Sequence, residues 1–174
     1  MSEYVHPEVL VDSKWVADHL HDSNVRLIEA DEDVLLYEVG HIPGAVKLDW
    51  HVDVQDKVAR DFLSQKEFEQ LMSRWGISND TTIVLYGDKN NWYACYSFWL
   101  FSMYGHTNQK IMNGGRSKWE AEQRPLTEAK ARRLPSRMPS FRTAKGSSTS
   151  CVSCIKAPRA KNGLCVAHFR DGDC

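Results

Sequence analysis

YEVGHIPGAVKL, at residues 37–48, is the most informative segment of this chain. Within it, Pro43-Gly44 is typical of a tight turn, and the apolar run that follows at residues 46–48 is expected to be a strand. His41 stands just before the turn with a polar ring to place. From the residues alone, His41 is either a structural hydrogen-bonding group that holds the loop or part of a functional site.

Around this segment, short apolar runs alternate with amphipathic stretches from residue 9 to about residue 126. The alternation is typical of an α/β domain with a short, mainly parallel sheet flanked by helices on both faces. The expected strands are residues 9–11, 26–30, 46–48, 82–86 and 111–112. The expected helices are residues 13–20, 65–75 and 92–104, with a short helix after Gly114-Gly115 that stops before Pro125.

Two of these helices carry further signals. Ser64 followed by Glu67 is a capping box, and Gly76 is a stop signal for the helix that begins there. The helix at residues 92–104 is apolar on nearly all sides, so we expect it to be buried against the sheet. Cys95 lies inside it and is expected to be a small core residue and not a nucleophile.

Charge is distributed unevenly along the 174 residues, although the formal net charge is only −1. Residues 1–127 contain 12 Lys and Arg against 20 Asp and Glu, whereas residues 128–174 contain 10 against 3. No apolar run is long enough for a membrane helix, and the first residues do not have the pattern of a secretion signal. We therefore expect a soluble, cytoplasmic protein with reduced thiols and no membrane contact.

Residues 37–48 fit a signature of an aromatic residue, three residues, His, an aliphatic residue, Pro-Gly-Ala, two residues and an aliphatic residue. Together with residues 84–94 and 113–119, which follow in order, they resemble the rhodanese family over roughly residues 9–126. The similarity is to the N-terminal half of a two-domain thiosulfate sulfurtransferase. It implies a rhodanese-like domain at residues 5–127, followed by a linker and a low-order tail at residues 128–174.

The resemblance also implies an activity: transfer of sulfur from thiosulfate, or from 3-mercaptopyruvate, to an acceptor such as cyanide, through a cysteine persulfide and without a cofactor. An active rhodanese domain places this cysteine first in the loop before a helix, where backbone amides stabilise it. Here the first loop position is Asp88, which cannot hold a persulfide, repels an anionic donor and could itself fill the nest of amides. The equivalent loop is Asp88, Lys89, Asn90, Asn91, Trp92, Tyr93 and Ala94.

In the two-domain family, an Asp of this kind is usual in the first domain, and the second domain supplies the cysteine. The resemblance therefore implies that this chain is inactive alone and that a C-terminal rhodanese domain is missing. His41 and an upstream acid are the implied assisting residues; Asp31 is the first candidate for the acid, and Glu29 or Asp33 could replace it. Trp92 either lines the cleft between the domains or packs in the core.

The basic segment after residue 127 does not match the family pattern. Its sudden Cys, Ser and Gly content indicates a truncated or frameshifted product, and it resembles no rhodanese segment. An alternative is a zinc site made by Cys151, Cys154, Cys165 and His168. Without stacking aromatic residues, a solvated basic tail is favoured over a nucleic-acid-binding one. Two functions stay open for the chain: half of a sulfurtransferase, or a non-catalytic rhodanese module for binding or regulation.

Overall fold

The structure is a computed structural model that describes residues 6–56 and 61–131. These residues belong to one compact unit, Met1–Ala144. The basic segment from residue 132 onward, with the four candidate zinc ligands, lies outside the described residues. No helix in the described parts of the chain has the length and apolar content needed to cross a membrane.

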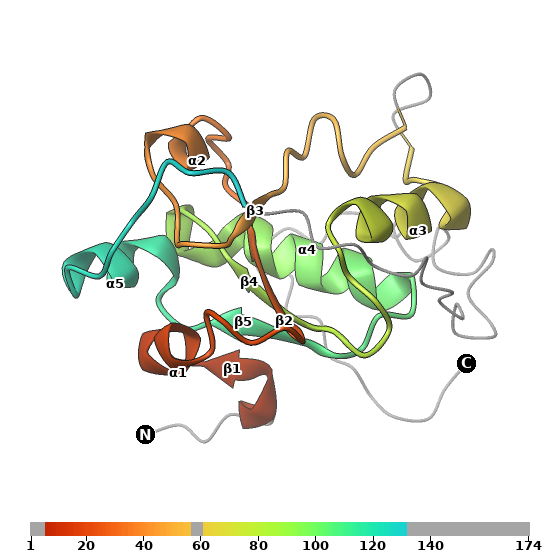
Figure 1. The fold of residues 1–174 in the computed structure, drawn as a ribbon. Coiled ribbons are helices and arrows are strands. Elements are labelled where there is room, and N and C mark those ends of the chain that lie inside the picture. Colours follow the sequence, from red (N-terminus) through yellow and green to blue (C-terminus); the bar gives the residue numbers. More distant parts are fainter. Residues whose placement is uncertain (1–5, 57–60, 132–174) are drawn as a thin grey trace, which may run out of the picture. The chain divides into compact units, whose positions relative to one another are not determined.

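A five-stranded sheet with the order β1-β5-β4-β2-β3 forms the centre of the fold, and all four strand pairings are parallel (Figure 1). The order confirms the expected α/β class with a short parallel sheet. Each expected strand is present, with ends that differ by at most two residues from the expectation. The strands are β1 (Leu10–Val11), β2 (Val25–Glu29), β3 (Val46–Lys47), β4 (Thr82–Tyr86) and β5 (Gln109–Met112).

Five α-helices connect or follow these strands, and four of them were expected from the sequence. The expected capping box of α3 is formed: the Ser64 side chain accepts from the Glu67 amide, and the Glu67 side chain accepts from the Ser64 amide. The sequence missed α2, which has only four residues and no side-chain cap. The helices are α1 (Ser13–Asp18), α2 (Leu36–Val39), α3 (Gln65–Arg74), α4 (Trp92–Met103) and α5 (Gly115–Ala121), with short 3-10 segments at Pro7–Val9 and Lys89–Asn91.

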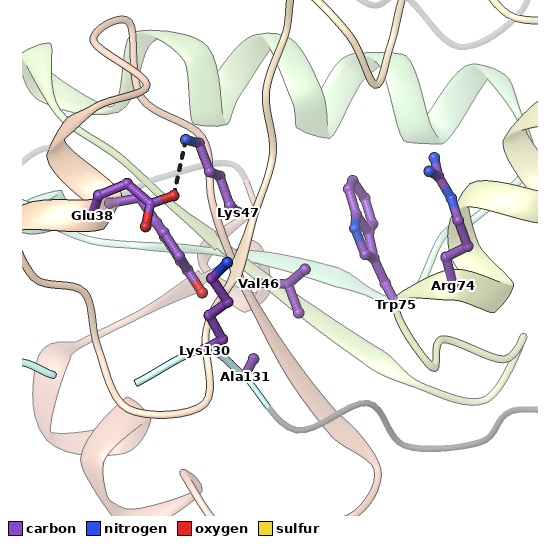
Figure 2. Close-up of a pocket in the computed structure, with 8 residues that line it drawn as sticks. Glu38, Val46, Lys47, Arg74, Trp75, Lys130 and Ala131 are labelled. Carbon is purple, nitrogen blue, oxygen red and sulfur yellow. Dashed lines mark hydrogen bonds and ion pairs between the residues drawn. The ribbon is translucent and has the colours of Figure 1, made fainter. Parts of the chain in front are cut away.

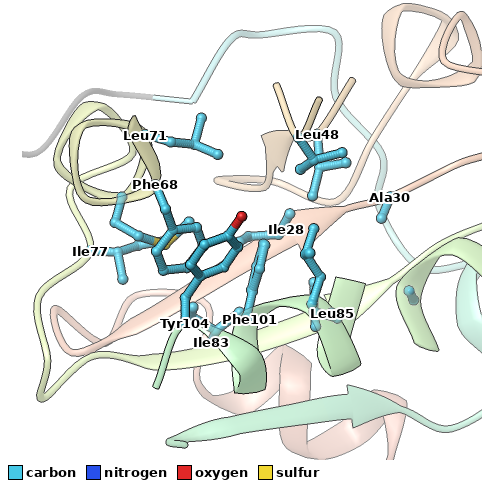
Figure 3. Packing of buried hydrophobic residues seen from close by; sticks show 14 residues of the cluster. Ile28, Ala30, Leu48, Phe68, Leu71, Ile77, Ile83, Leu85, Phe101 and Tyr104 are labelled. Carbon is cyan, nitrogen blue, oxygen red and sulfur yellow. The ribbon is translucent and has the colours of Figure 1, made fainter. Parts of the chain in front are cut away.

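Two hydrophobic clusters pack on the sheet. The first joins α3 and α4 to the strands, with Phe68 of α3 stacked on Tyr104 just after α4 at a centroid distance of 4.1 Å (Figure 3). The second joins Val16 of α1 and Trp119 of α5 to residues of β2 and β4. Because each cluster buries a different set of helices, the sheet is covered on both faces, as expected for this architecture.

The expectation for α4 was wrong in one respect. Only Ala94, Ser97, Leu100 and Phe101 of this helix are buried, and Cys95 is exposed. One face of α4 packs on the sheet, and aromatic side chains occupy the other face. The helix sequence is therefore apolar on all sides, although only one side of the helix is buried. Cys95 is therefore not a core residue. Neighbouring side chains nevertheless desolvate its thiol and raise its pKa, which disfavours the thiolate that a nucleophile needs.

Candidate functional site

The loop between β4 and α4 has an unusual backbone. Lys89, Asn90 and Asn91 are consecutive residues with φ of 43°, 59° and 64°, in the left-handed region that costs a non-glycine residue about 1 kcal/mol or more. The Asn91 side chain holds this conformation, because it accepts from the Gly87 amide at 3.0 Å and donates to the Met112 carbonyl at 2.7 Å. The loop is thereby fixed between the ends of two neighbouring strands.

Asp88 stands at the head of this loop and is 8% exposed. Its carboxylate accepts from the amides of Glu32, at 2.8 Å, and Asp33, at 3.3 Å, in the loop after β2. It makes no cap hydrogen bond at the start of the helical segment that follows it. The sequence left open that Asp88 binds the backbone amides of its own loop. In the structure its carboxylate instead accepts from two amides of the neighbouring loop.

Asp31 binds the backbone of Asp88. Its Oδ1 accepts from the Asp88 amide at 2.8 Å, while its buried Oδ2 accepts from no donor among the described residues. Burial, together with the negative charge of Glu29, raises the pKa of Asp31 to about 8. The raised pKa favours the protonated form of Asp31 at neutral pH, and that form can donate its O–H to Glu29.

Glu29 lies at the centre of a buried polar network. It accepts from the Arg116 guanidinium at 2.5 Å and from the Tyr86 hydroxyl at 2.6 Å. The Tyr86 oxygen in turn accepts from the Ile42 amide at 3.1 Å, which ties the network to the segment around His41. Burial raises the pKa of Tyr86 well above its usual value, so this hydroxyl is a fixed donor to Glu29.

His41 is fully buried and stacks on Tyr37 with ring centroids 3.7 Å apart. Its two ring nitrogens lie 2.9 Å from the Tyr37 carbonyl and 3.1 Å from the Ala129 carbonyl. The backbone of His41 also pairs with Thr127. These are the contacts of a structural residue that joins the Pro43-Gly44 turn to the chain after α5, and none of those described reaches Asp88. An assisting role for His41 stays a prediction.

Trp92 is 61% exposed and therefore does not pack in the core. The other interpretation, that it lines a cleft between two domains, stays a prediction. With Trp50, Gln55, Tyr93 and Tyr96, Trp92 lines a pocket of about 290 Å³ at the start of α4. Tyr93 stacks on Trp50 with a centroid distance of 5.3 Å. An aromatic surface therefore adjoins the Asp88 loop.

The residues of this site lie in the part of the chain that matches a family model. Residues 12–122 match the model of the rhodanese-like domain. The chain belongs to the rhodanese family. This match includes the Asp88 loop, Asp31 and His41, so the site described above is part of the rhodanese domain.

Relatives of this rhodanese domain are longer than the chain. The sulfur carrier protein TtuD of Thermus thermophilus is 62% identical over 124 residues, which cover 71% of this chain and 44% of that protein. The thiosulfate sulfurtransferase of Corynebacterium glutamicum is 45% identical over 122 residues, covering 70% and 40%. The chain thus spans less than half the length of these two relatives.

Solved structures share the fold. The crystal structure of SseA from Escherichia coli, presented with the rhodanese fold of 3-mercaptopyruvate sulfotransferases, has a TM-score of 0.69 and 23% identity. The match covers 84% of this chain and 61% of that one.

Sequence reasoning missed the buried network below the rhodanese loop. Arg116 lies in a segment that resembles the family, but nothing in the sequence indicates a role for it, and the sequence indicates Glu29 only as a substitute for Asp31. A charged residue at the end of an apolar strand was the signal that could have found the pair. In residues 6–56 and 61–131, no group of three His, Cys, Asp or Glu side chains is placed to hold a metal ion.

We expect Asp31→Asn to remove a pH dependence from the stability of the rhodanese domain. In the folded state the pKa of Asp31 is about 8, above the usual 3.8 of an aspartate, so the folded protein binds the extra proton and loses stability as the pH rises between these values. An amide at this position does not titrate. The free energy of unfolding of Asp31→Asn, relative to the wild type, should increase by about 1–2 kcal/mol between pH 6.5 and pH 8.

Urea unfolding at pH 5, 6.5 and 8 measures this difference. Asp18→Asn is the control, because a hydrogen bond from Lys14 lowers the pKa of Asp18 instead. If Asp31→Asn and the wild type have parallel stability profiles over this range, Asp31 is already ionised at pH 5 and the assignment is wrong.

Proposed function

We propose that this rhodanese domain is the non-catalytic N-terminal half of a thiosulfate sulfurtransferase. The observation that carries the proposal is Asp88 at the head of the loop between β4 and α4, where the resemblance expects the persulfide cysteine. Two backbone amides of the neighbouring loop bind its carboxylate. A carboxylate so held is neither a sulfur nucleophile nor a persulfide carrier. The length of the relatives beyond the match supports a second domain that supplies the cysteine.

The proposed reaction then takes place on the partner domain. Its cysteine thiolate attacks the outer sulfur of thiosulfate, the S–S bond of the donor breaks, and sulfite leaves with the electron pair. Cyanide next attacks the outer sulfur of the persulfide and leaves as thiocyanate, which restores the thiolate. The domain described here forms one wall of the site, with the fixed Asp88 loop as a rigid surface.

We expect no sulfur transfer by this chain alone. Intact-protein mass spectrometry after incubation with thiosulfate should show no added sulfur atom, and no thiocyanate should form when cyanide is added. A gain of one sulfur that cyanide removes would contradict the proposal. In that case Cys95→Ser separates the two sources: if this variant still gains sulfur, a cysteine of the segment 151–174 is responsible.

A second candidate is a non-catalytic module for binding or regulation, which the exposed Trp92 beside the loop favours. A separately purified C-terminal half of the Thermus thermophilus relative distinguishes the two. The half-enzyme proposal expects thiocyanate formation by that half to increase when this chain is added, whereas a binding module leaves it unchanged. Translation of the other two reading frames after the Arg142 codon gives a further test, since a frameshift predicts a Cys followed five residues later by Ser or Thr and then Ala.

A further inference from the structure

A second pocket lies away from the Asp88 loop, at the edge of the sheet formed by β3. It has a volume of about 300 Å³, which is within the range of small-molecule sites. Three basic residues line it, Lys47 of β3, Arg74 at the end of α3 and Lys130 in the segment after α5. Figure 2 shows the Lys47 and Lys130 ammonium groups on one side of Val46, and Trp75 and Arg74 on the other.

The basic groups of this pocket have unused hydrogen-bonding capacity. The Lys47 Nζ lies 3.4 Å from Glu38 Oε1, and the Arg74 Nη2 lies 3.5 Å from Asp53 Oδ1. Both distances exceed those of well-formed charge-assisted hydrogen bonds. Lys130 has no ion pair among the residues that the structure describes. Among the described residues that line the pocket, Glu38 is the one acid, so this lining carries a formal charge of +2.

This charge contrasts with the rest of the domain. Residues 1–127 contain eight more acidic than basic residues, so an anion is repelled by most of the surface. Three basic side chains around one hollow reverse the field locally. The same charge argues against the basic segment after residue 131 as the occupant, since like charges repel.

The remaining walls are apolar. Trp75 is half-buried, and its ring packs towards Phe101 of the core with a centroid distance of 6.4 Å. Val46 and the buried Tyr37 complete this part of the lining. A planar ring therefore finds apolar contact next to the basic groups.

We propose that this pocket binds an aromatic phosphate monoester. The dianionic phosphate lies between Lys47 and Lys130, matching the formal charge of the lining, and the ring lies against Trp75 and Val46. Arg74 stands at the opposite rim and stabilises the bound anion at longer range. The site uses no residue of the Asp88 loop, so it is independent of the function proposed above.

Isothermal titration calorimetry on the full chain at low ionic strength tests the site with phenyl phosphate, inorganic phosphate and phenol. Phenyl phosphate is expected to bind at least about tenfold more tightly than either fragment, because only it uses both parts of the pocket. Lys130→Gln, an exposed position, should weaken binding about fivefold or more, and Lys47→Gln should do the same. Lys66→Gln is the matched control: it removes the same charge from an exposed position of α3 outside the pocket, and should change binding less than twofold.

Three results would overturn the proposal. Equal weakening by Lys66→Gln and Lys130→Gln would mean that binding is a general charge effect. Phenyl phosphate that binds no better than inorganic phosphate, or not at all up to about 10 mM, would exclude the apolar part of the site. A glutamate-rich peptide that binds more tightly than phenyl phosphate and loses affinity in Lys130→Gln would assign the pocket to an acidic protein segment instead.

Discussion

Arg116→Met is expected to lower the free energy of unfolding by about 3–5 kcal/mol. The guanidinium is buried and donates to Glu29, which is itself almost inaccessible to solvent, and to Glu120 at 2.8 Å. Without Arg116, the Glu29 carboxylate keeps only neutral neighbours, the Tyr86 hydroxyl and the Asp31 carboxyl, and no opposite charge. A buried carboxylate without its partner is costly, whereas replacing both partners is much less so.

Urea unfolding of three variants measures this effect. Glu29→Gln combined with Arg116→Met should recover at least half of the stability that Arg116→Met alone loses, because the Glu29 charge is then no longer buried without its partner. Arg124→Met is the matched control: Arg124 pairs with Glu122 in a part-exposed position and lies over the Trp119 ring, an apolar contact that methionine can also make, so the change should cost about 1 kcal/mol or less. An Arg116→Met variant that is no less stable than Arg124→Met would show that the Glu29–Arg116 pair does not support the fold.

Gly87→Ala is expected to cost about 2–4 kcal/mol of stability. A Cβ at this position would overlap the carbonyl oxygen of Ala30, which is backbone and cannot rotate away. The Gly87 amide donates to Asn91, and its carbonyl accepts from the Arg116 amide at 3.0 Å. The loop, β2 and α5 therefore meet within the space of one missing side chain, and a methyl group there must separate them.

Gly44→Ala gives the control for this change, because a Cβ at residue 44 meets nothing within 4 Å. Its φ of +83° still disfavours alanine, so we expect a loss of about 1 kcal/mol. Thermal unfolding of both variants compares the two causes directly. If Gly87→Ala unfolds at the same temperature as Gly44→Ala, the close approach of β2 to the loop is not maintained in solution.

Arg116→Met and Gly87→Ala both test the residues that support the Asp88 loop. This support is the part of the site that the sequence did not predict. The rhodanese resemblance placed Asp88 first in the loop and named Asp31 as a candidate acid. It did not predict that Asp31 accepts from the Asp88 amide, nor that Asp88 turns to the amides of Glu32 and Asp33. These partners are 55 to 57 residues apart in sequence, so only the register of β2 against β4 brings them together.

The sequence by itself determined the features that depend on near neighbours. The five strands, four of the five helices and the capping box at Ser64 follow from local periodicity and from hydrogen bonds within one turn. The Pro43-Gly44 turn and the segments that match the rhodanese family also depend on near neighbours in the sequence. The domain boundaries at residues 5 and 127 stay a prediction.

Tertiary structure alone decided the features that depend on contacts across the sheet. The Glu29–Arg116 pair joins residues 87 positions apart, and the exposure of Cys95 depends on which face of an apolar helix meets the sheet. An all-apolar helix has no periodic signal to mark its buried face, and a buried charge shows its partner only when both strands and helices are in place. For this protein, local sequence therefore specified the elements, and packing specified which carboxylates are paired, protonated or bound to backbone amides.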